Sequence, residues 1–381
     1  MKLIFYKLTE SSPELFHTLI LPKVELSHSL VLRLYLPLAH RLKWDPQDPK
    51  PCIVISKYDT VSLTIIKTTA DFSSVFRQRT TSGHRVTSSG TRVNVAVLFL
   101  KVTLFPNQGF CIGITSHHSI LDVHYDKAME SPLIPEDLTP SFDCTVINVP
   151  RRLEAKMMEF LLYLSKDIDN LRSLKPPPAD QLSEKLRERA KKDSPRSLLE
   201  LHLSTFVIGY AYAWTCLVRA HGGHANRPVY LFYVADFRHW FNPQVLATYF
   251  GNGVFPTGCF GYEARAFLEE DGFVKAVEIL SDLVKRLDSQ GIESHLEAYV
   301  EGRNKIKQGA QIGTVSGSTQ LGVHGLDFGW GRPVETEFVS IDRNEAFSMS
   351  ERRYEPGGVE MGVCLKMSEI KIFLSLFKNG I

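Results

Sequence analysis

The stretch FCIGITSHHSILD, residues 110–122, places two histidines and an aspartate directly after a run of apolar residues. The apolar part, residues 110–115, predicts a buried strand, so His117 and His118 come at its carboxyl end, where α/β proteins commonly place their chemistry. Asp122 follows His118 by four residues. On a tight turn or a first helical turn this spacing puts both side chains on one face, where the carboxylate can brace the backbone or reach a cation. We interpret His118 as a candidate general base.

The spacing of His118 and Asp122 is a weak signal by itself. With 13 histidines in the chain, roughly half a match is expected by chance. The preceding text adds context, because residues 94–105 and 110–116 are two β-type runs around Pro-Asn-Gln-Gly at 106–109, a sequence suited to a turn. A hairpin that leads into His118 is therefore predicted.

Length and composition predict an ordinary soluble enzyme of two domains. The chain has 381 residues, more than one core usually holds, with 44% hydrophobic and 23% charged residues. A net charge of +2 points to neither nucleic acid nor an anionic membrane as a partner. Three prolines from Pro176 and the charged text after them predict a linker at 175–200, between an N-terminal domain at 1–174 and a C-terminal domain at 201–381.

Cysteine usage and the apolar segments predict a cytoplasmic protein. The six cysteines are scattered without a CxxC pair, so we expect free, mostly buried thiols in a reducing compartment. Residues 1–6 are too short an apolar run for a signal peptide, and the longest apolar stretch, 205–218, is too short to span a bilayer.

Hydrophobic patterning predicts most of the remaining elements. Residues 153–174 stay open between one helix and a strand followed by a helix, and residues 72–91 predict an exposed loop. The other predictions are helices at 30–38, 205–218 with Ser204 as N-cap, 271–287 and 368–377, a hairpin of 52–55 with 61–67, and strands at 229–234, 310–315, 338–341, 347–350 and 359–365.

Two motifs in this order resemble those of the plant BAHD acyltransferases, which use coenzyme A thioesters to acylate alcohols and amines. His118–Asp122 matches the HxxxD motif of that family, and Asp327–Gly331 matches its highly specific DFGWG motif. Shorter segments that resemble the family lie along nearly the whole chain. Residues 249–252, YFGN, are similar to the signature of the branch that malonylates flavonoid and phenolic glucosides.

The resemblance implies two similar α/β domains of the chloramphenicol acetyltransferase kind, with mixed sheets and a channel between them. His118 would be the catalytic base inside that channel, and Asp122 would point away from it and pair with Arg238. The DFGWG loop, which consists of Asp327, Phe328, Gly329, Trp330 and Gly331, would have a structural role. The segment Ser316, Gly317 and Ser318 would contact the phosphates of coenzyme A through small residues and free backbone amides.

The function implied is the transfer of a malonyl or similar group from coenzyme A to a hydroxyl of a phenolic or flavonoid glucoside. His118 would remove the proton from the acceptor hydroxyl as its oxygen attacks the thioester, without an acyl-enzyme. Malonyl-CoA or another acyl-CoA would be a co-substrate, with no permanently bound cofactor and no metal, and the protein is expected to be a monomer. A zinc site on His117, His118 and Asp122 lacks a nearby further ligand, and Cys111 lies in a buried strand, which disfavours a cysteine nucleophile.

Three departures from the family pattern support a rival hypothesis. The sequence begins inside what resembles the first domain and lacks the opening strand of the family. Val123 stands where a glycine usually follows the motif aspartate, and the helix expected next is missing, so we expect a truncated first domain. A smaller change is Gly253 after Asn252, where the malonyl branch usually has cysteine. The rival is an impaired or inactive family member that only binds coenzyme A or a phenolic ligand.

Overall fold

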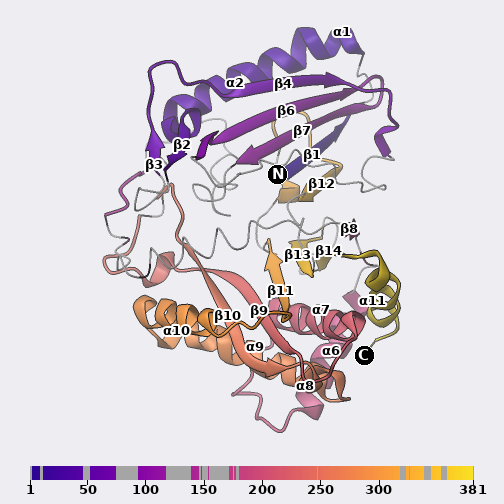
Figure 1. Cartoon of the computed structure of the whole chain (residues 1–381). Helices are drawn as coiled ribbons and strands as arrows, with labels where there is room; N and C mark the ends of the chain where they lie inside the picture. The colour runs from indigo at the N-terminus through magenta and orange to yellow at the C-terminus, as the bar shows by residue number, and fades with distance from the viewer. Residues whose placement is uncertain are drawn as a thin grey trace. The chain divides into compact units, whose positions relative to one another are not determined.

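The structure is a computed structural model, and the chain folds into two units, each built on a mixed β-sheet (Figure 1). Unit 1 comprises residues 1–147, 245–253 and 321–340, and unit 2 comprises residues 148–244, 254–320 and 341–381. The residues that the structure describes are 2–8, 12–45, 52–73, 93–116, 139–145, 147, 153, 171–174, 176, 180–246, 248–317, 323–325, 327–338, 345–352 and 358–380.

The main sheet of unit 1 has five strands in the order β12-β1-β7-β6-β4. Their bounds are Glu335–Phe338, Lys2–Lys7, Gly109–Ser116, Leu98–Phe105 and Ser62–Lys67. Only β4 and β6 pair in parallel; the other neighbours are antiparallel. The predicted hairpin is confirmed, since β6 and β7 pair from Phe105 with Gly109 to Leu98 with Ser116.

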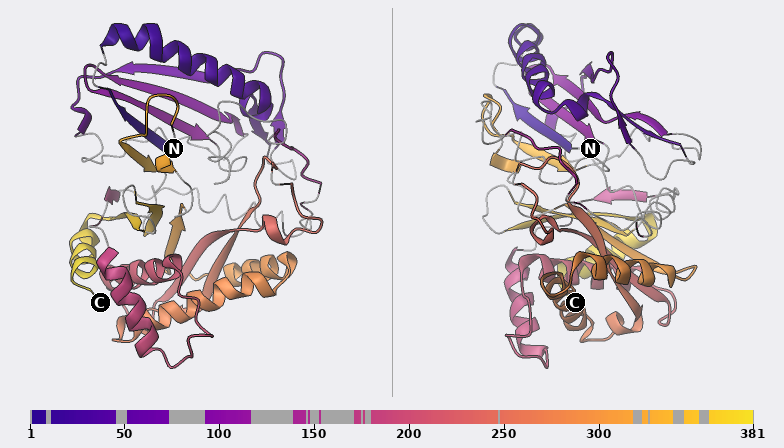
Figure 2. Two further views of the ribbon diagram at one scale, coloured as in Figure 1. Left: turned by 180° about the vertical axis from the view of Figure 1, so that it is seen from behind. Right: turned by 90° about the vertical axis from the view of Figure 1, so that its left-hand side faces the viewer.

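A helical segment covers one face of this sheet, as both views of Figure 2 show. It runs through α1 (Pro13–Leu15), the π-helical turn Phe16–Ile20 and α2 (Leu21–Leu34), and a 3₁₀ turn, Leu36–Ala39, follows. Phe16, Ile20 and Val24 are buried against apolar side chains of β1, β6 and β7. The helix predicted at 30–38 was therefore placed too late, because these buried residues lie upstream of it.

A second, three-stranded sheet of unit 1 corrects the predicted hairpin of 52–55 with 61–67. β3 (Cys52–Val54) pairs with β2 (Arg41–Trp44), which also pairs with β5 (Val93–Ala96). β4 instead pairs in parallel with β6 in the main sheet. The turn is present, because the Asp59 amide donates to the Ser56 carbonyl at 3.1 Å, but the strands on either side of it join different sheets.

The sheet of unit 2 has six strands in the order β10-β9-β11-β13-β14-β8. β11 pairs in parallel with both β9 and β13, and the other pairs are antiparallel. The strand bounds are β10 Val254–Glu263, β9 Pro228–Asp236, β11 Gln311–Ser316, β13 Ala346–Glu351, β14 Val359–Lys366 and β8 Leu171–Leu174.

Helices cover both faces of this second sheet. α7 (Thr205–His221) is almost wholly buried and begins at Ser204, whose Oγ accepts from the Val207 amide at 3.3 Å. α10 (Ile292–Asn304) packs on the opposite face, where Tyr230 and Phe232 lie. α9 (Gly272–Ser289) contacts α7 and β10, and α11 (Met367–Asn379) contacts α7 and β14.

The predicted elements of unit 2 were largely correct. The helices at 205–218, 271–287 and 368–377 and the strands at 229–234, 310–315, 347–350 and 359–365 are confirmed within a few residues. Of the strand predicted at 338–341 the structure describes only Phe338, the last residue of β12, which belongs to unit 1; residues 339–341 lie outside the described residues. Residues 153–174 lie mostly outside the described part, except Leu153 and β8.

The segment predicted as a linker, 175–200, contains a packed helix. α6 (Asp180–Asp193) buries Leu186 and Ala190 and contacts α7 and α9. Beyond it, Arg196 Nη1 lies 2.7 Å from Asp282 Oδ1 on α9. The charged composition that suggested a linker is the solvent face of a helix of unit 2. The channel expected between the two domains stays a prediction.

The described helices include none that is both long enough and apolar enough to cross a membrane. The expected free thiols are confirmed, since all six cysteines are unpaired. Four of them, Cys111, Cys216, Cys259 and Cys364, are buried.

Candidate active site

The strand that leads to the HxxxD motif is central in the sheet of unit 1. β7 pairs with β1 on one side and β6 on the other, and Phe110, Cys111 and Ile112 are buried. Gly109 at its start has φ +154°, and a Cβ there would lie 2.2 Å from the Tyr6 carbonyl oxygen, so the turn requires glycine. The described strand ends at Ser116.

The motif histidine and aspartate lie outside the described residues. His118, Asp122 and the neighbouring Val123 all fall in the range 117–138. The role of His118 as a base therefore stays a prediction. β7, the strand that precedes the motif, is hydrogen-bonded to β1 on one edge and to β6 on the other, so the position of the residue before the motif is fixed.

The DFGWG loop is closed by its own aspartate. Asp327 Oδ1 accepts from the Gly329 amide at 2.8 Å and from the Gly331 amide at 3.0 Å. Both glycines have positive φ, +86° and +78°, a conformation that side chains with a Cβ adopt at a cost. The residue types of the motif thus suit one tight, hydrogen-bonded turn.

The two aromatic residues of this loop pack on the sheet that carries β7. Trp330 lies edge-on to Phe110, with ring centroids 5.3 Å apart, and 5.9 Å from the ring of Tyr6. Phe328 is 6.2 Å from Tyr6. Burial, with a smaller effect from the Asp327 charge, raises the pKa of Tyr6 well above its usual value. β12 follows the loop and pairs with β1, so the described contacts of the motif are structural.

Arg238, expected to pair with Asp122, has another acidic contact that the sequence interpretation missed. Its Nη1 lies 3.1 Å from Asp236 Oδ1, which also accepts from the Arg238 amide at 3.0 Å. Arg238 is 9% exposed. An Asx-type turn at the end of β9 therefore orients the guanidinium, and the pair with Asp122 stays a prediction.

The proposed phosphate segment lies at the end of β11. Gly317 has φ +88°, and a Cβ there would lie 2.5 Å from the Met349 carbonyl oxygen, so only glycine fits. Ser318 lies outside the described residues. Because β9 and β11 are parallel, Ser316 and Gly317 share one sheet edge with Asp236 and Arg238. Carboxyl ends of parallel strands are the usual place for ligands in α/β sheets.

The YFGN text at 249–252 folds onto unit 1. The Phe250 ring lies 4.8 Å from the ring of Tyr35 and 5.6 Å from that of Phe142. The Phe250 amide donates to the Ser141 carbonyl at 2.7 Å. A Cβ on Gly251 would lie 2.4 Å from the Tyr249 hydroxyl, so glycine permits this close packing. The contacts of Tyr249, Phe250 and Gly251 described here are thus packing contacts within unit 1.

Two further groups bear on the chemistry. Burial raises the pKa of the Cys111 thiol to about 12, so it stays protonated at neutral pH and is a poor nucleophile. In unit 2, the side chains of His221, Glu345 and Glu369 converge, with ligand atoms within 4.8 Å of one another. No sequence pattern pointed to this cluster, because its members come from three separate elements.

Comparison with known proteins identifies the family. A model of the Transferase family matches residues 154–379. Phenolic glucoside malonyltransferase 2 of Arabidopsis thaliana is 44% identical over 100% of this chain and 90% of that protein. From the same species, a BAHD acyltransferase is 47% identical over 99% of this chain and 90% of its own length, and agmatine coumaroyltransferase is 46% identical over 100% and 91%. The chain belongs to the BAHD acyltransferase family.

This BAHD acyltransferase is thus an acyl-transferring enzyme, and the family suggested by HxxxD and DFGWG is confirmed. Its fold resembles that in the crystal structure of vinorine synthase, with a TM-score of 0.71 at 18% identity over 97% of this chain and 87% of that one. The predicted fold class of two α/β units with mixed sheets is likewise confirmed.

Proposed function

We propose that this BAHD acyltransferase moves a malonyl group from malonyl-CoA to a hydroxyl of a phenolic or flavonoid glucoside. The observation that carries the proposal is the 44% identity, over the whole chain, to phenolic glucoside malonyltransferase 2. The YFGN text at 249–252 supports the same branch. Six unpaired cysteines favour a reducing compartment, consistent with the cytoplasmic location we propose.

His118 is the general base in the proposed mechanism. Its neutral imidazole nitrogen takes the proton of the acceptor hydroxyl while that oxygen attacks the thioester carbonyl carbon. The carbon–sulfur bond then breaks, and the leaving sulfur takes the proton from the imidazolium, so coenzyme A departs as a thiol. Arg238 and Asp122 would hold the motif turn, and Gly317 would offer a backbone amide to a phosphate. The raised pKa of Cys111 favours this direct route over an acyl-cysteine.

A second candidate is transfer of an aromatic acyl group to an amine. It is favoured by the 46% identity to agmatine coumaroyltransferase, a value as high as that to the malonyltransferase. Overall sequence identity therefore does not discriminate between a malonyl and a coumaroyl donor. A crossed assay does: malonyl-CoA and coumaroyl-CoA are each tested with a phenolic glucoside and with agmatine. We expect the highest kcat/KM for the malonyl donor with the glucoside.

The same assay tests the base. His118→Ala should lower kcat/KM by about 10² to 10⁴-fold, the usual contribution of a general base. His117→Ala is the matched control, because it removes the adjacent imidazole and should retain most activity. Equal turnover in the His118→Ala variant would refute the mechanism, and no turnover with any pair of substrates would favour the inactive, ligand-binding alternative.

A further inference from the structure

Unit 2 contains a cluster of one imidazole and two buried carboxylates, His221, Glu345 and Glu369. One possible ligand atom of each residue lies within 4.8 Å of those of the other two. His221 is the last residue of α7, Glu345 directly precedes β13, and Glu369 lies in the first turn of α11. The helices α7 and α11 pack side by side (Figure 1). The fold therefore brings three side chains of the types that bind metal ions to one point.

The spacing of these atoms suits a tetrahedral ion. Zn²⁺ binds histidine nitrogen and carboxylate oxygen at about 2.0–2.2 Å, which places two ligand atoms about 3.3–3.6 Å apart. His221 Nδ1 lies 3.5 Å from Glu369 Oε1, within this range. Nδ1 is closer to Glu345 Oε1, because a hydrogen bond joins these two atoms. A metal ion would replace the proton of that bond, and a small rotation of the His221 ring would make room for the ion.

Hydrogen bonds alone leave part of the cluster without a partner. An imidazole Nδ1 carries at most one hydrogen, so it cannot donate to both carboxylates. Glu369 is 7% exposed, and its Oε2 has no hydrogen-bond partner among the described residues. Lys366 Nζ is 3.9 Å from Glu369 Oε1, too far for a hydrogen bond, and its side chain is 44% exposed. A buried carboxylate oxygen without a partner is costly, and a metal ion bound by this carboxylate would relieve that cost.

The side chains around Glu345 hold it as outer residues commonly hold a metal ligand. Gln311 Nε2 donates to Glu345 Oε1 at 2.9 Å. Arg227, itself buried, donates from Nη2 to Gln311 Oε1 at 3.0 Å and so orients the amide. Carboxylates that bind metals are usually fixed by such hydrogen bonds. The His221 side chain is 26% exposed, which gives an ion access from solvent and leaves a place for water as a fourth ligand.

We propose that His221, Glu345 and Glu369 bind a divalent transition-metal ion, of which Zn²⁺ fits best. One imidazole nitrogen with two carboxylate oxygens suits Zn²⁺ better than Mg²⁺ or Ca²⁺, which prefer oxygen ligands alone. The ion ties the end of α7 and the start of α11 to β13, and so stabilises unit 2. It is structural and takes no part in acyl transfer, so the proposal is independent of His118. No metal was expected from the sequence, because the three ligands are far apart along the chain.

The test is isothermal titration of the full chain with ZnCl₂, after treatment with EDTA and removal of the chelator. Cys52→Ser and Cys144→Ser are introduced first, because exposed thiols also bind zinc. We expect one ion to bind per chain, and Mg²⁺ to bind at least about 100-fold more weakly. Glu369→Gln should weaken zinc binding at least about 100-fold, since loss of an outer partner alone costs 10–100-fold. His224→Gln is the matched control, because this exposed histidine follows His221 by three residues and lies outside the cluster.

Thermal unfolding and hydrogen exchange separate a metal site from a cluster that is only hydrogen-bonded. With Zn²⁺ at about a hundredfold excess over Kd, the Tm of the EDTA-treated chain should rise by about 5 °C, and exchange should slow at the start of α11. Glu369→Gln should show neither change on adding zinc, although without zinc it should be at least as stable as the unmodified chain. The proposal fails if Glu369→Gln binds zinc as tightly as the unmodified chain, if Mg²⁺ binds equally well, or if zinc leaves both Tm and exchange unchanged.

Discussion

The indole of Trp330 packs edge-on against the ring of Phe110, with ring centroids 5.3 Å apart and ring planes at 88°. Phe110 is the second residue of β7, the strand that leads to the HxxxD motif, whereas Trp330 comes from the DFGWG loop more than two hundred residues later. The second motif thus supports the strand that delivers the first. The presence of His118 alone would therefore not fix the position of the strand that precedes it.

The first prediction is that Trp330→Ala destabilises unit 1. Full burial of a tryptophan makes its truncation cost about 3–5 kcal/mol; Trp330 is only partly buried, so we expect about 2 kcal/mol. Hydrogen exchange should be faster in β1 and β7. Trp240→Ala, in unit 2, is the control and should leave exchange in those strands unchanged. Equal exchange in both variants would show that the indole adds nothing to the sheet.

The second prediction separates the shape of Asp327 from its charge. Its Oδ1 accepts from two amides, so Asp327→Ala should cost about 1 kcal/mol, whereas Asp327→Asn keeps an acceptor oxygen and should cost less. Urea unfolding of the two variants measures the difference. If asparagine is as harmful as alanine, the negative charge rather than the hydrogen-bonded turn is what the position requires.

The third prediction concerns cysteine reactivity. Cys52 and Cys144 are exposed, so iodoacetamide should label them first in the native chain. Burial raises the pKa of Cys111 and of Cys259 to about 12, which leaves almost no thiolate at pH 8. Mass spectrometry of the alkylated protein locates the labels. Rapid labelling of Cys111, or an acyl group trapped on it during turnover, would favour a covalent mechanism instead.

Local patterns predicted the elements that local chemistry determines. The hairpin of β6 and β7 followed from two β-type runs around the turn at 106–109, and α7 followed from its apolar run and the Ser204 cap. The pairing of β4 with β6 could not be predicted in this way, because a turn reverses the chain but does not determine which strand β4 pairs with. β1 was missed, because the six residues that form it, at the start of the sequence, are too few to show a strand pattern by themselves.

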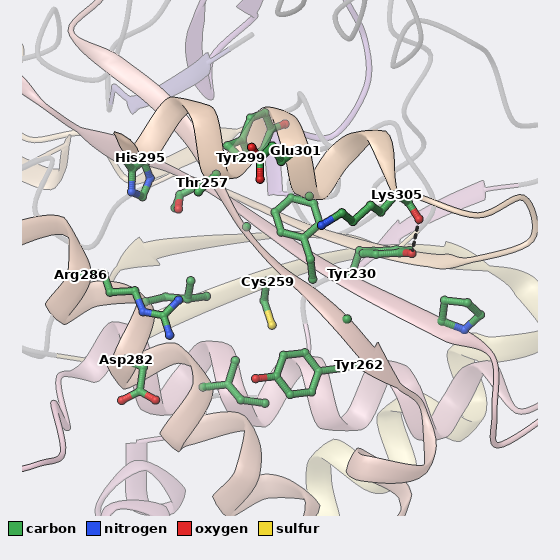
Figure 3. Close-up of a pocket in the computed structure, with 18 of the residues that line it drawn as sticks. Tyr230, Thr257, Cys259, Tyr262, Asp282, Arg286, His295, Tyr299, Glu301 and Lys305 are labelled. Atoms are coloured by element: carbon green, nitrogen blue, oxygen red, sulfur yellow. Dashed lines mark hydrogen bonds between the residues drawn. The ribbon is translucent and has the colours of Figure 1, made fainter. Parts of the chain in front are cut away.

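For the site residues, too, the sequence identified local motifs but not the contacts between distant segments. The motif singled out Asp327 to Gly331 as a structural loop, which stays a prediction, but the contacts of this loop with Tyr6 and Phe110 depend on pairing between distant segments. Arg238 was singled out for a partner at Asp122, and its contact with Asp236, two residues away, was overlooked although Asp-x-Arg spacing permits it. The pocket lined by residues of β10, α9 and α10 (Figure 3) has no sequence signal, because these helices bring its walls together only in the folded unit.

The last prediction is that Glu369→Gln stabilises the protein at pH 7. Glu369 is 7% exposed, and its pKa is raised by burial and then by the nearby Glu345 carboxylate, so the folded state disfavours its charged form. The penalty is absent below the unfolded pKa of about 4.5 and complete above the raised folded pKa, so the gain from glutamine should be present at pH 7 and vanish in acid. Glu345→Gln is the contrasting variant. Its carboxylate contacts His221 Nδ1 and accepts from Gln311 Nε2 at 2.9 Å, so that substitution should destabilise at pH 7. Thermal unfolding of the three proteins between pH 4 and 8 measures both effects; a Glu369→Gln variant that is less stable than the unmodified chain at pH 7 would mean that the His221 contact, 3.5 Å away, outweighs burial.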